Sequence, residues 1–269
     1  MNAEKKRVAV VTGASGGIGE ALAKELGRRG WLVTLAARRE EELRRVAAEM
    51  PSKTAVVVAD VTRRADVERI REETLRVFGH VDAWINNAGR GIAKPTLELT
   101  DDDVDEMITV NVKSALYGMQ AIIPYFQAQD AGHLVNVSSF LGRVPLASIR
   151  SAYSAAKAAL NSLTANLRMD LAATHPAVHV SLVMPGIVST SFAKNVRGGA
   201  PPPGAVTPAG PPPALPNAPA GAMTPQTAEE VASQIADLLD TPTAELYTNP
   251  AHPEIARAFA SNPGSLKGG

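Results

Sequence analysis

The chain has 269 residues, with 27 Lys plus Arg, 27 Asp plus Glu and no Cys. This length suits one α/β domain with a large core, and the lack of Cys excludes disulfides and thiolate metal sites. Balanced charge argues against a nucleic-acid or anionic-membrane partner, and no apolar run reaches the ~18 residues of a membrane helix. Because Met1 to Arg7 lead straight into an apolar run, we expect no signal peptide and a cytoplasmic protein.

Apolar runs alternate with helical patterns along the chain, as in successive βαβ units. The runs suited to buried strands are Arg7–Val11, Leu32–Ala37, Ala55–Ala59, Val81–Ile85, His133–Val137, His179–Met184 and Ala244–Tyr247. The helical patterns lie at about 20–29, 40–49, 63–78, 101–129, 151–174 and 227–240. We therefore expect a single α/β domain over residues 1–269, a doubly wound Rossmann fold whose parallel sheet of about seven strands carries helices on both faces.

A glycine-rich turn follows the first predicted strand and opens the first predicted helix. Its residues are Thr12-Gly13-Ala14-Ser15-Gly16-Gly17-Ile18-Gly19. A strand, such a turn and a helix in this order are typical of a dinucleotide site. Gly13 permits the tight turn, Gly17 lets the pyrophosphate approach the backbone, and Gly19 allows close packing of helix on strand. The helix N-terminus adds free N–H groups for the phosphates. The alternative is a turn that binds nothing.

Arg38 and Arg39 follow the second predicted strand, where the adenosine ribose of a dinucleotide lies. An acid there would bond the ribose 2′-hydroxyl of NAD, whereas this chain has Ala37 and then Arg38. A guanidinium pairs well with the 2′-phosphate of NADP. We expect NADP(H), with NAD(H) as the second choice. The alternative is a solvated pair balanced by Glu40 to Glu42.

Two other polar groups are better explained by structure than by metal binding. The run Asp101 to Asp103 fits the first turn of a helix, where carboxylates suit the helix dipole. His175 and His179 have helical spacing, but Pro176 breaks the helix between them. No metal site is therefore expected.

Tyr153 and Lys157 stand one helical turn apart, and Tyr153 comes fourteen residues after Ser139 in the pair Ser138-Ser139. Positions i and i+4 share a helix face, so the phenol and the ammonium point into the same space. A cation about 4 Å from a phenolate contributes roughly 4 kcal/mol, which would lower a Tyr pKa from about 10 to about 7. Such a pair suits general acid/base catalysis. The alternative is an exposed pair on an ordinary amphipathic helix.

These motifs, in this order, resemble the classical short-chain dehydrogenase/reductase family over about residues 7–190. In that resemblance Asp60 binds the adenine amino group, and the segment from Pro185 to Thr190 closes over the nicotinamide. The catalytic tetrad would be Asn111, Ser139, Tyr153 and Lys157. The cofactor contacts would be Gly13, Ser15, Gly17, Ile18, Gly19, Arg38, Asp60, Val61, Asn87, Ala88, Gly89, Tyr153, Lys157, Pro185, Gly186, Val188 and Thr190.

The resemblance also implies a role for each catalytic side chain. Ser139 bonds the carbonyl oxygen, Tyr153 donates its proton, and Lys157 lowers the pKa of Tyr153 and holds the nicotinamide ribose. Asn111 anchors a water that relays protons toward Lys157. Ser139 is chosen over Ser138 because the family pattern Ser-Ser-x-x-Gly ends at the glycine three residues later. Ser138 would then bond backbone.

The implied function is an NAD(P)(H)-dependent oxidoreductase, with NADP(H) preferred, that interconverts a carbonyl and an alcohol by hydride transfer. Gly16 weakens that preference, because many NADP-dependent members have a basic residue there. A non-catalytic, nucleotide-binding regulatory protein is one alternative. An epimerase or dehydratase of the extended branch is another, although the roughly 80 residues after Thr190 are few for its substrate domain.

Neither the motifs nor the resemblance names the substrate, a small carbonyl or alcohol compound. The residues expected around it are Arg90, Leu141, Arg143, Ile187 and Phe192. Similar chains often form homodimers or homotetramers through helices like those predicted at 101–129 and 151–174. We therefore expect a homo-oligomer.

Between Gly198 and Pro225 the composition excludes a helix or a central strand, since ten of the 20 Pro lie between 201 and 225. Long loops in compact domains are functional lids or disordered segments. The position of this segment after Pro185-Gly186 favours a substrate lid over about residues 190–226. A disordered polyproline-II loop and a Pro-rich recognition ligand are the alternatives.

Overall fold

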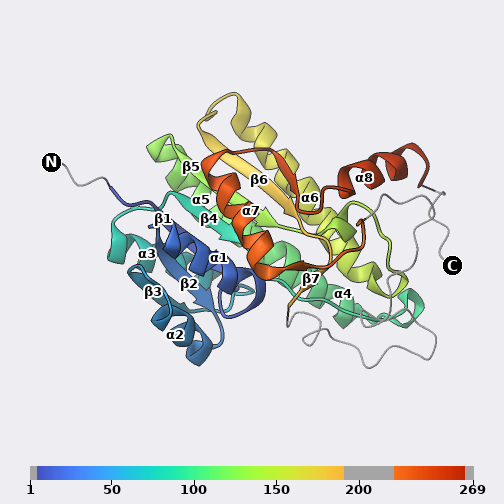
Figure 1. Ribbon diagram of the computed structural model, residues 1–269, viewed down its shortest axis with the longest axis horizontal. Coiled ribbons are helices and arrows are strands. Elements are labelled where there is room, and N and C mark those ends of the chain that lie inside the picture. The colour runs from blue at the N-terminus through green and yellow to red at the C-terminus, as the bar shows by residue number, and fades with distance from the viewer. Residues whose placement is uncertain (1–4, 191–220, 264–269) are drawn as a thin grey trace.

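The computed structural model describes residues 5–190 and 221–263. Its centre is a seven-stranded, fully parallel sheet with the order β3-β2-β1-β4-β5-β6-β9 (Figure 1). The strands are β1 (Val8–Thr12), β2 (Leu32–Ala37), β3 (Thr54–Val58), β4 (Ala83–Asn86), β5 (Gly132–Val137), β6 (Val178–Met184) and β9 (Glu245–Tyr247). The order reverses between β1 and β4, as in a doubly wound sheet. The predicted fold is confirmed, and each predicted strand is present within about two residues at either end.

Both faces of the sheet are buried, which explains why its strands are almost continuously apolar. On β1, Val11 packs into one core cluster and Val10 into the other. The helices over the first face are α1 (Gly17–Arg28), α2 (Glu40–Ala48) and α7 (Ala228–Asp240). The helices over the second face are α3 (Arg64–Phe78), α5 (Ser114–Gln129) and α6 (Ser151–Ala172).

The long helix predicted at 101–129 is divided into three parts. α4 (Asp101–Ile108) begins with a capping box, in which Thr100 and Asp103 each accept a hydrogen bond from the other's backbone N–H. A π-helical turn over Thr109–Lys113 then leads into α5. The acidic run thus has the role in helix initiation that the sequence predicts. Within residues 5–190 and 221–263, no cluster of three His or acidic side chains is arranged to hold a metal ion.

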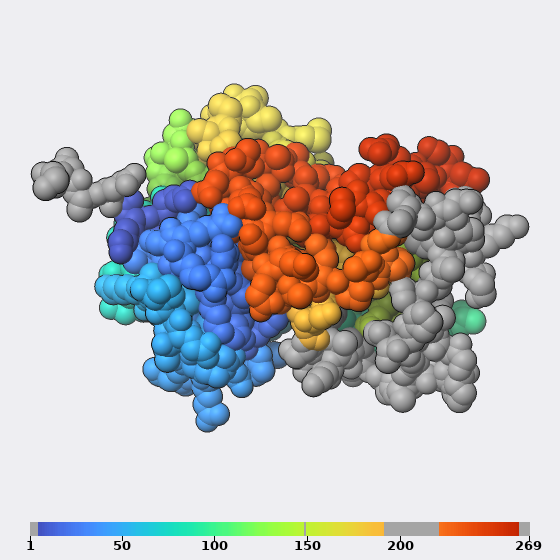
Figure 2. All heavy atoms as spheres, in the orientation of Figure 1, coloured from blue at the N-terminus to red at the C-terminus, as the bar shows by residue number. Residues whose placement is uncertain are grey.

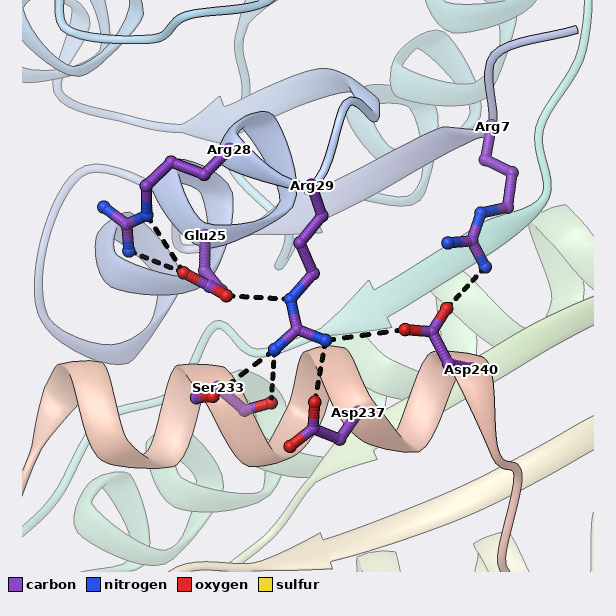
Figure 3. Close-up of polar contacts among 7 residues, drawn as sticks. All are labelled: Arg7, Glu25, Arg28, Arg29, Ser233, Asp237 and Asp240. Carbon is purple, nitrogen blue, oxygen red and sulfur yellow. Dashed lines mark hydrogen bonds and ion pairs between the residues drawn. The ribbon is translucent and has the colours of Figure 1, made fainter. Parts of the chain in front are cut away.

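The ends of α1 and α7 are tied together by charged side chains (Figure 3). The Arg29 guanidinium, just after α1, bonds Glu25 on α1 and Asp237 on α7, both at 2.7 Å. Its remaining nitrogen reaches Ser233 O at 3.4 Å and Ser233 Oγ at 3.3 Å. Arg7, just before β1, pairs with Asp240 on α7 at 2.7 Å. The helix that begins at the glycine-rich turn is therefore fixed to a helix about 208 residues further along the chain.

Residues 221–263 contain α7 and continue past it into β9 and a further helix. Figure 2 shows their orange and red atoms as a continuous band beside the blue atoms of the N-terminal half. Helix α8 (His252–Ser261) and the short parallel pair β7 (Val188–Ser189) and β8 (Gln226–Thr227) have no counterpart among the predicted elements. The segment predicted as a substrate lid lies almost entirely outside the described residues. In the described part of the chain, no helix is both long and apolar enough to cross a bilayer.

Candidate active site

The predicted site residues lie at one edge of the sheet, because most of them follow the carboxyl ends of its parallel strands. The glycine-rich turn follows β1, Arg38 follows β2, Asp60 and Val61 follow β3, Asn87 to Gly89 follow β4, Ser139 follows β5, and Pro185 and Gly186 follow β6. Asn111, Tyr153 and Lys157 reach the same edge from helices. In open α/β sheets, ligands bind at this edge where the strand order reverses.

The turn after β1 is built from close backbone contacts. Gly13 and Gly17 have φ values of 68° and 57°, a conformation that favours glycine. A Cβ on Gly19 would overlap Gly13 O and would lie 2.5 Å from Asn87 Nδ2. Gly16 precedes α1 and has no side chain that could cap the helix. The first backbone N–H groups of α1 therefore have no capping side chain and can bind an anion at the turn. These features fit the pyrophosphate of a dinucleotide.

Thr12, the last residue of β1, joins this turn to the segment after β4. Its Oγ1 accepts hydrogen bonds from Asn87 N at 3.0 Å and Ala88 N at 3.1 Å, and it donates to Ile85 O at 3.2 Å. Asn87 Nδ2 in turn donates to Thr12 O at 2.9 Å. Thr12 is not among the predicted site residues, although it opens the glycine motif. Its buried hydroxyl holds two predicted cofactor contacts in place.

At the end of the site predicted to hold the adenosine, Arg39 contacts the glycine-rich turn. Its Nη2 donates to Ser15 O at 2.7 Å and to Ser15 Oγ at 3.1 Å. Arg38, the predicted phosphate contact, is exposed beside it. Asp60 Oδ1, after β3, accepts from Thr62 N at 3.0 Å and Thr62 Oγ1 at 2.7 Å, which orients the carboxylate. In the sequence, the feature that pointed to Arg39 as a site residue was its position next to Arg38.

Tyr153 and Ser139 form the polar centre of the site. Both side chains are buried, and they are hydrogen-bonded to each other. Ser139 Oγ also accepts from Leu141 N at 3.2 Å, at the start of the 3-10 turn Phe140–Gly142. Burial raises the pKa of Tyr153 to about 12, and the bond with Ser139 offsets this only in part. Tyr153 therefore keeps its proton at neutral pH.

Lys157 lies one turn after Tyr153 on α6 and is also buried. Its Nζ donates to Val137 O at 2.9 Å and lies 5.8 Å from the centre of the Tyr153 ring. Burial lowers the pKa of Lys157 to about 8. The predicted Tyr153 pKa near 7 is wrong for the protein's own side chains, because the pKa is raised instead. The loss of solvent around the phenol outweighs the lowering by the Ser139 hydrogen bond and by the positive charge of Arg150.

Asn111 lies in the π-helical turn, an irregularity often found at functional sites. Its Nδ2 donates to Arg90 O at 2.9 Å and Met107 O at 3.1 Å, and its Oδ1 accepts from Arg90 N at 3.2 Å. A Cβ on Gly89 would lie 2.9 Å from Asn111 Oδ1 and 3.5 Å from Lys157 Nζ, so both groups border this glycine. The Asn111 amide fixes the chain after Gly89. Its role in a water relay stays a prediction.

Ser138 is turned toward α6. Its Oγ donates to Asn161 Oδ1 at 2.5 Å and lies 3.3 Å from Lys157 O. Asn161 follows Lys157 by one helical turn, so this bond and the contact with Lys157 O anchor to the end of β5 the part of α6 that carries Lys157. Asn161 is not among the predicted site residues. In the sequence, its i,i+4 spacing from Lys157 could have identified it as a neighbour of the site.

The segment from Pro185 to Thr190 returns to the glycine-rich turn. Pro185 O accepts from Phe140 N at 2.8 Å, which ties the segment to the residue after Ser139. Val188 belongs to β7. A Cβ on Gly17 would lie 3.5 Å from Thr190 Cβ, so the far end of the segment contacts the turn. The segment predicted to cover the nicotinamide thus spans from the Ser139 loop to the glycine-rich turn.

The side chains predicted around the substrate have other contacts as well. Arg143 is paired with an acidic side chain of β9 at 2.5 Å, and Arg90 with one of α4 at 2.6 Å. Leu141 is half-buried and Ile187 is exposed. Phe192 lies outside the described residues. A substrate role for these residues stays a prediction.

The arrangement can move a proton to or from an oxygen atom. Tyr153 is a neutral acid, Ser139 is a second hydroxyl bonded to it, and Lys157 is a buried amine beside them. Fixed donors of this kind stabilise charge that develops on an oxygen during reaction. The glycine-rich turn at the same edge fits the phosphates of a dinucleotide.

Comparison with known proteins agrees with this geometry. The family model for short chain dehydrogenase matches residues 7–200. An uncharacterized oxidoreductase of Staphylococcus epidermidis is 37% identical over 191 residues, which cover 71% of this chain and 82% of the relative. A short chain dehydrogenase/reductase of Burkholderia phymatum, solved in complex with NAD, has a TM-score of 0.81 at 25% identity and covers 100% of this chain and 98% of that one.

A second solved structure is an alcohol dehydrogenase from the archaeon Thermococcus sibiricus, complexed with 5-hydroxy-NADP. It has a TM-score of 0.73 at 25% identity and covers 92% of this chain and 97% of that one. The family model alone spans well over half of the chain. The chain therefore belongs to the short-chain dehydrogenase/reductase family and is an oxidoreductase of that type.

Proposed function

We propose that this enzyme interconverts a carbonyl and an alcohol with NADP(H), and that Tyr153 is the general acid/base. The observation that carries the proposal is the buried hydrogen bond between Tyr153 and Ser139, with Lys157 one turn away on α6. A nucleotide-binding protein without catalysis has no need for these three groups together. The neighbour from Thermococcus sibiricus, an alcohol dehydrogenase, supports the same reaction class.

The chain's own residues divide the work of the reaction. When bound, a nicotinamide dinucleotide supplies or takes up the reducing equivalents. Ser139 holds the substrate oxygen by a hydrogen bond, and Tyr153 donates its proton to that oxygen in the direction of reduction. Burial keeps the phenol protonated at neutral pH, so the proton is present for the direction of reduction, but the raised pKa also makes the phenol a weaker acid. Protonated Lys157 stabilises the phenolate that remains.

The NADP(H) preference rests on the cations beside the turn. Arg39 is already bonded to Ser15, and Arg38 stands exposed next to it. Ala37 has no carboxylate to bond the ribose 2′-hydroxyl, and such a carboxylate would favour NAD(H). NAD(H) is the second choice, since the Burkholderia phymatum neighbour was solved with NAD.

A homodimer or homotetramer formed through α4, α5 and α6 is also part of the proposal. Met169 on α6 and Val104 on α4 are large apolar side chains that are 73% and 43% exposed. Apolar side chains exposed on these helices support association there. Sedimentation of the purified protein would report an oligomer, and a monomer at micromolar concentration would exclude it.

Turnover of a panel of aldehydes, ketones and alcohols tests the proposed reaction. Purified enzyme with NADPH should oxidise the cofactor with at least one carbonyl compound, and NADH should give a lower kcat/KM. A regulatory protein would bind NADPH without turnover. An epimerase or dehydratase would convert a substrate without net oxidation of NADPH, so product analysis separates the three functions.

A further inference from the structure

His252, the first residue of α8, contacts three segments of the chain at once. Its ring stacks on the Phe140 ring, with centroids 3.7 Å apart and planes 12° apart. Its Nε2 lies 3.0 Å from Ala222 O. Its Cε1 occupies the space that a Cβ on Gly186 would need. His252 as a whole is 2% exposed, so these contacts are made in the interior.

Two of these segments belong to the candidate active site. Phe140 follows Ser139 directly, and its N–H donates to Pro185 O at 2.8 Å. Gly186 follows Pro185. The ring of His252 thus backs the Ser139 loop and the predicted nicotinamide segment where the two are hydrogen-bonded to each other. Any side chain at position 186 would displace this ring.

The hydrogen bonds of the imidazole define its tautomer. Ala222 O can only accept, so Nε2 carries the hydrogen. Nδ1 is buried and has no hydrogen-bond partner among the described residues. Burial lowers the pKa of His252, which keeps the ring neutral at neutral pH. A neutral ring stacks on Phe140 without burying a charge there.

We propose that His252 is a positioning residue for catalysis, which holds Ser139 in alignment with the Pro185–Gly186 segment by stacking on Phe140 and filling the space beside Gly186. The inference rests on the proposed function, because it assigns the alignment to the same reaction. A misplacement of about 1 Å in an active site can reduce turnover about 10²-fold. A residue that never touches the substrate can therefore limit kcat.

A purely structural role is the competing explanation, because His252 lies beside a small core cluster of Phe140, Val144, Ala222, Ile255 and Ala256. Ile255 offers a matched control. It lies in the same cluster and on the same helix, whereas the ring stacked on Phe140, the bond to Ala222 O and the contact at Gly186 belong to His252. Ile255→Ala should lower the unfolding temperature without changing the alignment of Ser139.

The test compares His252→Gln, His252→Phe and Ile255→Ala by hydrogen exchange and steady-state kinetics. His252→Gln keeps a donor for Ala222 but loses the stacked ring. It should speed exchange of the Phe140 amide at least about tenfold and lower kcat at least about tenfold. His252→Phe, which restores a ring over Phe140, should recover most of both. Ile255→Ala should leave both within about threefold of the wild type.

Two results would overturn the proposal. One is an unchanged Phe140 amide exchange in His252→Gln. The other is a loss of kcat in Ile255→Ala as large as that in His252→Gln, which would make the effect one of general stability. Failure of the proposed function would look different: the wild type itself would turn over no carbonyl compound, while the exchange data would still decide whether His252 holds the Ser139 loop.

Discussion

At the residue scale, burial sets the protonation of the proposed catalytic groups, Tyr153 and Lys157. It raises the pKa of Tyr153 to about 12 and lowers the pKa of Lys157 to about 8. Both shifts have the same cause, because removal from water disfavours the charged form of each group. Tyr153 therefore holds its proton at neutral pH, although the raised pKa makes it a weaker acid. Proton abstraction by this residue needs a protonated Lys157 close by to stabilise the phenolate.

The depressed pKa of Lys157 predicts a pH-dependent effect on stability. Below pH 8 the lysine is charged in both states, and its burial costs the folded state on the order of 3 kcal/mol, given an ordinary value of 10.5. Between pH 8 and 10.5 the folded state loses this proton first, so wild-type stability gains with rising pH. Lys157→Met lacks the penalty and should be more stable than the wild type at pH 7.

Urea unfolding at pH 7 and pH 9.5 measures this difference. The advantage of Lys157→Met should narrow at the higher pH, because the wild type then loses its buried charge. The raised pKa of Tyr153 lies above this range and affects both proteins alike. A variant less stable than the wild type at both pH values would show that the bond to Val137 O outweighs desolvation.

Arg38 and Arg39 should have different effects on cofactor choice. Arg38→Ala should weaken NADPH by roughly 1.5–3 kcal/mol, the range for hydrogen bonds to charged groups, and leave NADH nearly unchanged. Arg39→Ala should weaken both cofactors, because its guanidinium holds Ser15 in the turn. Fluorescence titration of each variant with NADPH and NADH gives the four affinities. Equal effects of Arg38→Ala on both cofactors, or a wild-type kcat/KM that favours NADH, would contradict the NADP(H) assignment.

At the element scale, α1 is held at both of its ends. Its N-terminus forms the glycine-rich turn, and the residues at its C-terminal end pair with α7 (Figure 3). The side chain of Arg29 is only 24% exposed and has several partners, whereas that of Arg28 is 58% exposed and pairs only with Glu25 among the described contacts. Isolated, exposed ion pairs contribute little, but a partly buried network contributes more.

Arg29→Ala should therefore lower the free energy of unfolding by about 1–2 kcal/mol, because it leaves Asp237 and Ser233 without this partner. Arg28→Ala is the matched control and should change it by less than about 0.5 kcal/mol. Denaturant unfolding at low and high salt measures both. Equal, small effects would mean that apolar packing alone holds α1 to α7.

The elements differ in how well the sequence predicts them. Apolar strands and long amphipathic helices have a clear period, and all seven sheet strands and most helices follow it. The π-helical turn around Asn111 has no such signal, because it continues the helical pattern on both sides. Helix α8 is short, and His252 belongs to no motif. Its contacts to Phe140 and Gly186 come from packing between distant segments, which periodicity does not report.

The features of the candidate site also differ in how well the sequence predicts them. Gly13, Gly17 and Gly19 are predictable because backbone conformation and close contact demand glycine. The lowered Tyr153 pKa was predicted from helical spacing alone, and spacing contains no information on burial. The structure reverses the sign of that shift, because desolvation depends on the whole tertiary fold.

At the scale of the whole molecule, one continuous sheet brings the two halves of the chain to the same edge. The N-terminal half provides the glycine-rich turn, and the second half provides Ser139, Tyr153, Lys157 and the segment after β6. Thr190 contacts Gly17 across this edge. The glycine-rich turn and the proposed proton donor thus lie together at one edge of the sheet.

The most direct test of this account is the turnover of Tyr153→Phe on a carbonyl compound that the wild type reduces. Removal of the phenolic hydroxyl should lower kcat at least ~10²-fold, the low end for general acid catalysis. NADPH affinity should stay near the wild-type value, since the pyrophosphate turn is untouched. Tyr125→Phe, on α5, is the matched control and should keep full activity. Near-normal turnover by Tyr153→Phe would contradict the central claim that Tyr153 is the proton donor.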